Sequence, residues 1–387
     1  MNLKRLLYYV LFFIGFLGFS ISFSQIIPFL TEMGYTASER GYILSFSALV
    51  GIAAQFLIGI VCDRMQKTKP MLILSIVVFT IAATVIYQLQ DPLLTIMLFW
   101  GSFTIAFFRT SNNLLETWIY TIDEDTRLHF GTIRVFGSIG WAVGSMVLGF
   151  LIRSYGYSVI SLAIVPIMIV VLFMIFPLQD SDYQDTNSSF NFQELKILLK
   201  NKQFLLLLLV FFWVFLIFNM DQFTVIDYLL SLNAGSEVIG FKWSLQAVVE
   251  MPLMVLGIHF LLKFGLKKIV ILATLSLVVR FVGIGLTSNI WLIMAYSSLQ
   301  AIFFPLILLA QKEAVNQQVP AHMSASGHLI MTSITSNIPV IVMPLISSWA
   351  STKMSLSALI MWAGLSLLVP ILLMLLYKEP KTNAAKA

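Results

Sequence analysis

The sequence is poor in charge and in cysteine. Lys, Arg, Asp and Glu make up only 11% of its 387 residues, whereas hydrophobic residues make up 59%. A soluble globule of this length cannot bury so much apolar surface, so the chain is expected to lie in a lipid bilayer. Cys62 is the only cysteine, which excludes a disulfide framework and a cysteine-based metal site. The four histidines have no ligand-like spacing, and we expect no metal and no cofactor.

Two other classes of protein are disfavoured by what the sequence lacks. The net charge of +5 would suit nucleic-acid binding, but the basic residues stand beside hydrophobic segments rather than together on one face. The orientation of the helices in the membrane explains the positions of these basic residues, so no nucleic-acid partner is expected. The sequence also has no cluster of nucleophile, base or metal ligands that would indicate an enzyme.

Long apolar runs dominate the chain. Cutting the sequence where turn formers or charge clusters interrupt runs of about 20 apolar residues predicts about twelve membrane-spanning helices. The predicted spans are 6–30, 40–62, 70–89, 93–121, 129–152, 157–177, 203–231, 237–262, 268–287, 290–311, 323–349 and 355–377. The predicted fold class is therefore an all-α membrane protein.

A polar stretch divides these spans into two sets of six. We predict an N-terminal six-helix bundle at 1–177, a cytoplasmic linker at 178–202 and a C-terminal six-helix bundle at 203–387. A basic turn near Asp63 follows the second span, and a similar turn from Lys263 to Lys268 follows the eighth, about 200 residues later. Such repetition is typical of duplicated transporter bundles with a solute site at the midplane, so the two bundles are expected to be pseudo-symmetric.

The basic residues also orient the helices, because cytoplasmic loops are enriched in Lys and Arg. With the N-terminus inside, only Arg40, Arg153 and Lys353 fall on the outer side. The cytoplasmic set is Lys4, Arg5, Arg64, Lys67, Lys69, Arg127, Lys196, Lys200, Lys202, Lys263, Lys267, Lys268, Lys378, Lys381 and Lys386. We predict a multi-pass protein of the cytoplasmic membrane with both termini in the cytoplasm.

Several ionisable residues fall inside or at the edges of predicted spans. A charge at the bilayer centre costs at least about 2.5–3.5 kcal/mol, so each needs a partner, a wet cavity or a function. These residues are Arg109, Glu116, Arg134, Asp221, Asp227, Lys242, Glu250, Arg280, Lys312 and Glu313. They are the candidates for the chemistry of the protein.

Glu116 and Arg134 lie in consecutive spans that run antiparallel, near the turn that joins them. We predict that they pair. Trp141 is two helical turns beyond Arg134, so its indole is expected to share that face and to form an aromatic platform over the guanidinium. An arginine beside a tryptophan suits a sugar, because the guanidinium donates to vicinal hydroxyls while the ring stacks on the pyranose. The alternative is a structural ion pair with an interfacial tryptophan.

Glu250 and Arg280 lie centrally in adjacent antiparallel spans, and we predict that they too pair. The protonation of a carboxyl group in a low-dielectric cavity depends on whether a cation is near, which is the behaviour of a proton-coupling acid. The alternative is a permanent lock between two helices. Asp221 and Lys242 are second-rank candidates that either face the cavity or form a stabilising pair.

Other features of these spans are expected to be structural. Arg109 is assigned to packing within the bundle and Asp227 to the outer interface. Gly137, Gly140 and Gly144 lie in one span and predict a surface of close helix packing.

Two motifs carry a resemblance to a known family. The first is Gly59-xxx-Asp63-Arg64-xx-Lys67-x-Lys69, with Gln66 at the place of the usual glycine. The second is Phe130-Gly131-xx-Arg134-Val-Phe136-Gly137-Ser138-x-Gly140-Trp141. Over essentially its whole length the sequence resembles the major facilitator superfamily, in the lactose-permease-like branch that also includes nucleoside and phenylpropionate proton symporters.

The resemblance implies roles for individual residues. It implies a conformational role for the loop residues Gly59, Asp63, Arg64 and Lys67, and solute contacts for Arg134 and Trp141, with Glu116 as the partner of the arginine. Arg280 matches an arginine of helix nine, and Asp221 resembles a charged position of helix seven.

The second half also departs from the lactose-type pattern. The helix-ten histidine and glutamate of that pattern fall on Gln300 and Phe303, and the helix-ten lysine falls on Ser297. Glu250 is displaced by about one turn from the usual acid of helix eight, which is closer to the nucleoside and phenylpropionate members. The lactose-type protonation site is therefore absent.

These observations predict a secondary transporter that couples a small polar solute to protons by alternating access. The solute is expected to be a sugar or oligosaccharide, or next a nucleoside, bound by Glu116, Arg134, Trp141 and Gln300. Glu250, Arg280 and Asp221 are the predicted proton-coupling residues. The alternatives are a proton-antiporting exporter of amphipathic compounds and a membrane sensor or assembly factor that transports nothing. Such bundles commonly work alone, so we expect a monomer.

Overall fold

The computed structural model describes residues 3–90, 93–180, 198, 200–320 and 323–379. The described residues form helices and no β-strand, which confirms the predicted all-α class. Most of the predicted linker, at 181–197 and 199, lies outside the described residues, as do Lys381 and Lys386. Ten of the described helical runs are long and apolar enough to cross a membrane, and Val159–Ile175 is a shorter apolar helix.

The helices of the first half match the six predicted spans. They are α1 (Leu3–Phe23) continued by α2 (Ile26–Glu32), α3 (Ala37–Met65), α4 (Lys69–Ile86), α5 (Leu94–Ile122), α6 (Glu124–Tyr155) and α7 (Val159–Ile175). Side chains at the predicted breaks cap these helices. Thr36 forms a capping box with Glu39 at the start of α3, and the Asp123 carboxylate accepts from the Thr126 N–H at the start of α6.

The second half is more interrupted. Its helices are α9 (Lys202–Phe218), the 3-10 turn η1 (Asn219–Gln222), α10 (Thr224–Ser231), α11 (Ser236–Gly285), α12 (Ile290–Ser297), α13 (Gln300–Gln318), α14 (Ser324–Thr332), the π-helical η3 (Ser333–Asn337), α15 (Ile338–Ser351), α16 (Leu356–Ser366) and α17 (Leu368–Leu376). The 50-residue run of α11 contains Gly265 at φ 79°, where the backbone is not helical. This glycine separates the two spans predicted at 237–262 and 268–287.

The chain folds into two compact units. One comprises Met1–Thr186, Gln222–Met251 and Pro344–Leu356, and the other comprises Asn187–Asp221, Pro252–Met343 and Ser357–Ala387. At two places the chain passes from one unit to the other directly before a proline, at Pro252 in α11 and at Pro344 in α15. Proline removes a helical hydrogen bond at each of these places. We call these the first and the second unit. The division into bundles at 1–177 and 203–387 stays a prediction.

Each unit contains the same polar turn. In the first, the Asp180 carboxylate accepts from the Thr68 and Lys69 N–H groups, while Lys69 Nζ donates to the carbonyls of Phe176 and Leu178.

In the second unit, the Glu379 carboxylate accepts from the Lys267 N–H, and Lys267 Nζ donates to the carbonyls of Leu375 and Tyr377. The corresponding residues are about 200 positions apart, as in the repeat seen in the sequence.

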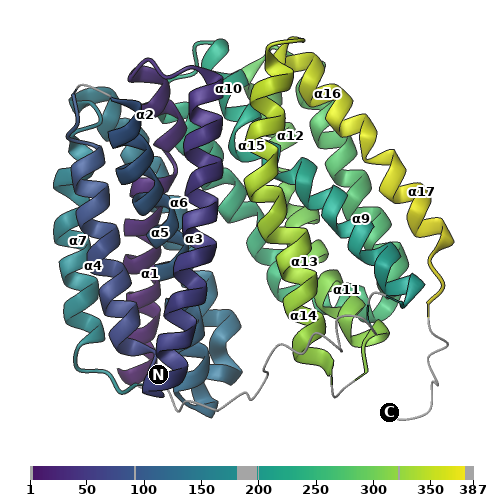
Figure 1. Cartoon of the computed structure of the whole chain (residues 1–387), viewed down its shortest axis with the longest axis horizontal. Helices are drawn as coiled ribbons and strands as arrows, with labels where there is room; N and C mark the ends of the chain where they lie inside the picture. Colours follow the sequence, from purple (N-terminus) through teal and green to yellow (C-terminus); the bar gives the residue numbers. More distant parts are fainter. Residues whose placement is uncertain (1–2, 91–92, 181–197, 199, 321–322, 380–387) are drawn as a thin grey trace. The chain divides into compact units, whose positions relative to one another are not determined.

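Close packing of α6 fixes the centre of the first unit, where α1 to α7 run side by side (Figure 1). A Cβ atom on Gly140 would lie 2.0 Å from the Phe13 carbonyl oxygen of α1, and one on Gly144 would lie 2.7 Å from the Leu17 oxygen. On another side of α6, a Cβ on Gly149 would lie 2.6 Å from the Ser236 oxygen of α11. The predicted packing surface is thus confirmed, and it brings α1, α6 and the start of α11 together.

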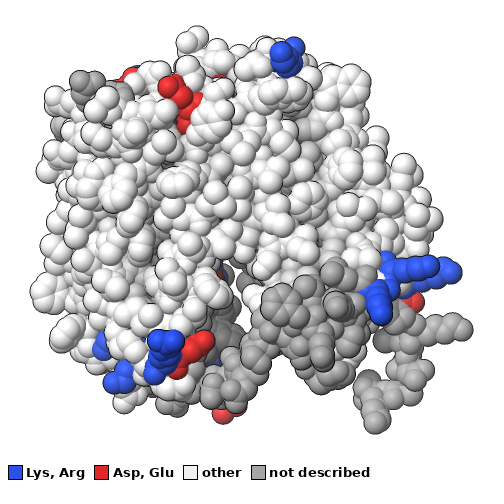
Figure 2. All heavy atoms as spheres, viewed as in Figure 1, with Lys and Arg blue, Asp and Glu red and all other residues white. Residues whose placement is uncertain are grey.

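On the face seen in Figure 2, Lys, Arg, Asp and Glu gather at the ends of the helices, and the surface between them is uncharged. Large apolar side chains of α7 and of the residue that follows it are exposed, such as Leu162, Phe173 and Phe176. An exposed apolar belt of this kind fits the hydrocarbon core of a bilayer.

Candidate functional site

Glu116 of α5 and Arg134 of α6 form the predicted ion pair, with Nε and Oε1 2.8 Å apart. The pair is only partly buried, since the arginine side chain is 26% exposed and the glutamate side chain 30%. Arg134 also donates to the Ser138 hydroxyl over 3.3 Å. Its guanidinium lies over the ring of Phe16, 4.5 Å from the centroid. We call Glu116 and Arg134 the open pair.

Trp141 belongs to a separate aromatic group. Its ring lies 6.1 Å from that of Phe23, 5.9 Å from that of Phe108 and 6.4 Å from that of Trp243, measured between centroids. The predicted aromatic platform under Arg134 is therefore supplied by Phe16 of α1 and not by Trp141. The sequence analysis missed Phe16, because nothing in a phenylalanine-rich helix marks the one ring that meets a guanidinium.

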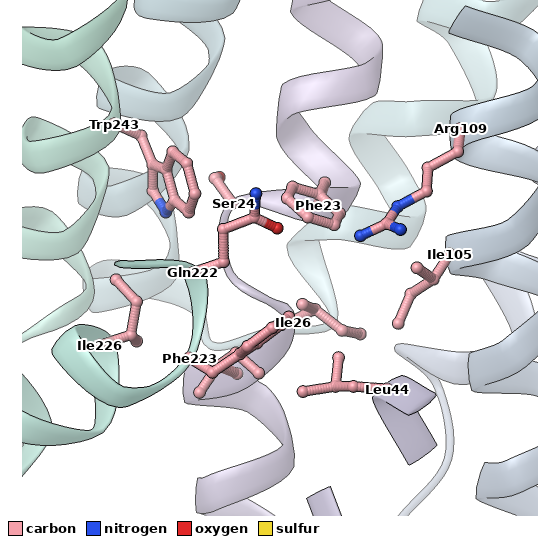
Figure 3. Close-up of a pocket in the computed structure, with 11 residues that line it drawn as sticks. Phe23, Ser24, Ile26, Leu44, Ile105, Arg109, Gln222, Phe223, Ile226 and Trp243 are labelled. Carbon is pink, nitrogen blue, oxygen red and sulfur yellow. The ribbon is translucent and has the colours of Figure 1, made fainter. Parts of the chain in front are cut away.

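A cavity lies next to this aromatic group within the first unit (Figure 3). It is bounded by the turn between α1 and α2, by α3, α5 and α10, and by the start of α11. Its lining residues are Phe23, Ser24, Ile26, Ile27, Leu44, Ile105, Arg109, Gln222, Phe223, Ile226 and Trp243. Arg109, which the sequence analysis assigned to packing, thus borders a cavity that is otherwise mostly apolar.

A second cluster, in the second unit, joins Asp221 of η1, Arg280 of α11 and Gln300 of α13. Arg280 Nη2 lies 2.5 Å from Asp221 Oδ1, and Arg280 Nη1 donates to Gln300 Oε1 over 2.5 Å. The arginine side chain is 0% exposed and the aspartate side chain 3%. The first contact is an ion pair without the alignment of a hydrogen bond. We call Asp221 and Arg280 the buried pair.

The second-rank candidate Lys242 and the predicted coupling residue Glu250 lie in the first part of α11. Lys242 is fully buried, with Nζ 4.7 Å from the centroid of Trp243 and 3.4 Å from Gln246 Oε1. Glu250 is partly buried in the same helix. Glu250 belongs to the first unit and Arg280 to the second, and their pairing stays a prediction.

The loop motif stands at the end of α3. Gln66 caps this helix in the left-handed region, at φ 54° and ψ 35°, which explains why the family pattern has a glycine there. Its side-chain amide donates to the Asp63 carbonyl over 2.9 Å. Gly59 faces open space, and Arg64 and Lys67 are exposed. The conformational role of Gly59, Asp63, Arg64 and Lys67 stays a prediction.

Two further ion pairs were not predicted. Arg40 of α3 lies 2.8 Å from Asp227 of α10, and Arg153 of α6 lies 3.1 Å from Glu237 of α11. Both join helices from distant parts of the sequence within the first unit. All four residues stand at or near the ends of predicted spans, and this position was the only indication of the two pairs in the sequence.

The described residues include no group of three or more His, Cys, Asp or Glu placed to hold a metal ion. The site is thus made of ion pairs, amides and aromatic rings in lipid-spanning helices.

Comparison with known proteins identifies the family, since its model matches residues 3–372. The chain belongs to the MFS_1 like family. This MFS_1 like protein is 22% identical to the sucrose permease of Escherichia coli over 86% of its own length and 83% of the permease. It is 25% identical to the uncharacterized transporter YwbF of Bacillus subtilis (strain 168), over 80% of its own length and 78% of that protein.

A crystal structure of the nucleoside transporter NupG has the same fold, with a TM-score of 0.82 at 14% identity, covering 97% of this chain and 99% of that one. Because the family model matches nearly the whole chain and the sucrose permease matches most of it, the protein is a multi-pass membrane transporter and not an enzyme.

Proposed function

We propose that this protein is a proton-coupled symporter of a small polar organic solute, a sugar or oligosaccharide first and a nucleoside next, working by alternating access. The open pair carries this proposal. An arginine and a glutamate that are both partly exposed inside lipid-spanning helices can exchange their mutual contact for contacts with a hydroxylated solute. A pair sealed by packing would have to be broken at high cost before it could bind anything.

The chemistry of the open pair suits a sugar or a ribose. The guanidinium of Arg134 donates hydrogen bonds in a planar fork, and the carboxylate of Glu116 accepts them, so together they match neighbouring hydroxyl groups. Phe16 beneath the guanidinium holds it in place, and Trp141 offers a ring for stacking nearby on α6. Gln300 is proposed as a further solute contact through its amide.

Proton coupling is assigned to Glu250, Arg280 and Asp221. Carboxyl groups near an arginine in a low-dielectric region change protonation when the arginine changes partner. Asp221 lies within ion-pair distance of Arg280, and Glu250 is the only acid in the part of α11 that precedes Pro252 and follows Lys242. We further propose that the loop residues Gly59, Asp63, Arg64 and Lys67 act in conformational change.

Similarity to known transporters supports the proposed classes of solute. A sucrose permease matches most of the chain, and a nucleoside transporter shares the fold. We propose placement in the cytoplasmic membrane with both termini inside, and function as a monomer.

Transport by purified protein in proteoliposomes tests the proposal. With an inward proton gradient, the wild type is expected to accumulate at least one of radiolabelled sucrose, lactose and uridine. Glu250→Gln is expected to abolish uphill uptake but to spare counterflow of the same solute, because exchange needs no net proton movement. Glu237→Gln, an acid of the same helix paired with Arg153, is the matched control and is expected to accumulate solute normally.

The outcome also separates the alternatives. Undiminished proton-driven accumulation by Glu250→Gln would remove this residue from the mechanism. Accumulation only when the gradient is reversed would indicate a proton-antiporting exporter instead.

A further inference from the structure

Polar side chains around the cavity of the first unit are left without partners. The hydroxyl oxygen of Ser24, the side-chain oxygen of Gln222 and the indole nitrogen of Trp243 are buried atoms that make no hydrogen bond. Arg109 of α5 has no hydrogen bond or ion pair to any residue that the structure describes, and its guanidinium points into the same cavity in Figure 3. Buried polar groups in folded proteins are nearly always satisfied, so such a cluster around one space indicates a ligand.

The size of the cavity limits this ligand to a very small molecule. The free space admits the centre of a water-sized sphere over about 10 Å³, which is close to the least that a single water molecule needs. The remaining walls are apolar, for example Leu44, Ile105 and Phe223. A sugar ring or a nucleobase therefore does not fit.

The chemistry of the lining selects water. The guanidinium of Arg109 and the indole N–H of Trp243 only donate hydrogen bonds, whereas the side-chain oxygen of Gln222 only accepts them and the Ser24 hydroxyl does both. A cation would be repelled by Arg109, and an anion by the oxygen of Gln222. One water molecule can accept from Arg109 and Trp243 and can donate to Gln222 and Ser24, so it satisfies groups of both kinds.

Two of these side chains stand where a long helix is interrupted. Ser24 lies between α1 and α2, and Gln222 is the last residue of η1, which separates α9 from α10. Gln222 follows Ser24 by about 200 positions, the spacing of the repeat seen in the sequence. Interrupted helices within a membrane need side chains or ordered water to satisfy the polar groups that they leave.

We propose that one ordered water molecule occupies this cavity and connects Arg109 and Trp243 to the two helix interruptions at Ser24 and Gln222. The water lets the oxygen of Gln222 stabilise the guanidinium of Arg109, although no direct hydrogen bond joins these two residues. The site is separate from the open pair and from the residues to which proton coupling is assigned.

Hydroxyl-radical labelling by X-ray radiolysis tests the proposal on purified protein in nanodiscs, because radicals formed from a bound water oxidise the side chains around it. Ile105 borders the cavity and is only 3% exposed, and we expect mass spectrometry to find it oxidised. Ile119 of the same helix is 0% exposed, packs in the apolar core and should stay unlabelled. Gln222→Met removes an acceptor at similar side-chain length and should reduce labelling of Ile105 at least about 3-fold.

Thermal unfolding measures the link between Arg109 and Gln222. Gln222→Met is expected to lower the unfolding midpoint by several degrees, because it removes an acceptor that supports the guanidinium through the water. In the background of Arg109→Met the same substitution should cost less than half as much, since residues that share a partner do not act independently. Gln88→Met is the matched control, because Gln88 is exposed after α4 and should have the same small effect in both backgrounds.

Several results would overturn the proposal. One is a wild type in which Ile105 is labelled no more than Ile119, a comparison that needs no variant to fold. Another is labelling of Ile105 that Gln222→Met leaves unchanged. Additive effects of Arg109→Met and Gln222→Met would show that no shared partner joins them, and coupling without labelling would assign the link to a direct hydrogen bond. These readouts need no solute and no proton gradient, so they are independent of the proposed transport function.

Discussion

The open pair and the buried pair are both arginine–carboxylate pairs in lipid-spanning helices, but they differ in their exposure to solvent. The side chains of the buried pair, Arg280 and Asp221, are 0% and 3% exposed, whereas those of the open pair, Arg134 and Glu116, are 26% and 30% exposed. A guanidinium and a carboxylate are therefore shielded from solvent in the buried pair and partly in contact with it in the open pair. A pair without water is hard to separate, because each charge would be left uncompensated, but a partly exposed pair can trade partners.

This difference suggests a division of work. The open pair is suited to contact a solute, and the buried pair is suited to hold helices together or to pass on a change in protonation. Two other pairs lie between and beyond these limits. Arg40 and Asp227 are 11% and 17% exposed, and Arg153 and Glu237 are 68% and 25% exposed. The four pairs form a series in which the cost of breaking the pair should fall as exposure rises.

The largest effect is expected for the buried pair. Asp221→Asn leaves the guanidinium of Arg280 without its carboxylate, which should lower the free energy of unfolding by about 3–5 kcal/mol. Chemical denaturation of the purified protein measures the loss. The double variant Asp221→Asn with Arg280→Gln should recover most of it, because no charge is then left alone. A double variant no more stable than the single one would show that the two charges are not coupled.

A smaller effect is expected for Asp227→Asn. Arg40 would keep its hydrogen bond to the Tyr35 carbonyl, at 2.7 Å, but would lose its charged acceptor. The loss should be about 1.5–3 kcal/mol, since a hydrogen bond to a charged group disappears. The same denaturation assay measures it, and a cost as large as that of Asp221→Asn would break the relation between exposure and stability.

Glu116→Gln should separate stability from binding. Because the open pair is partly exposed, the variant should lose at most about 1 kcal/mol of stability. Its binding of a transported solute should nevertheless weaken strongly, as seen by thermal shift with that solute. Unchanged binding together with a large loss of stability would reverse the roles that we assign to the two pairs.

The smallest effect is expected for Glu237→Gln. Its partner Arg153 is mostly exposed, and a surface substitution of this kind should change stability by less than about 0.5 kcal/mol. Denaturation measures this as well, and a loss comparable to that of Asp227→Asn would indicate that the contact between the end of α6 and the start of α11 depends on the pair.

Much of the fold was predictable because the bilayer constrains the sequence strongly. The spans followed from apolar runs, and the packing surface of α6 followed from Gly137, Gly140 and Gly144. Glu116 and Arg134 could be paired because a short turn joins their antiparallel helices. For two such helices, the number of residues from the turn and the rise of the helix determine how deep each side chain lies in the membrane.

The parts that were missed depend on contacts between distant segments. Asp221 stands in a 3-10 turn between α9 and α10, and no sequence pattern places such a turn beside Arg280 of α11. Phe16 of α1 meets Arg134 where the ring also lies against Gly137 of α6, on which a Cβ atom would lie 3.0 Å from the ring. The cavity around Arg109 likewise combines segments near residues 24, 105, 222 and 243, which only the folded chain brings together.

Counterflow in proteoliposomes tests the division between the two pairs most directly. Sucrose, lactose and uridine are the solutes, and each variant is compared with the wild type for whichever of them the wild type exchanges. We predict that Glu116→Gln loses exchange, whereas Asp221→Asn with Arg280→Gln keeps it while losing uphill uptake. Exchange at the wild-type rate by Glu116→Gln, with loss of exchange in the double variant, would contradict the account.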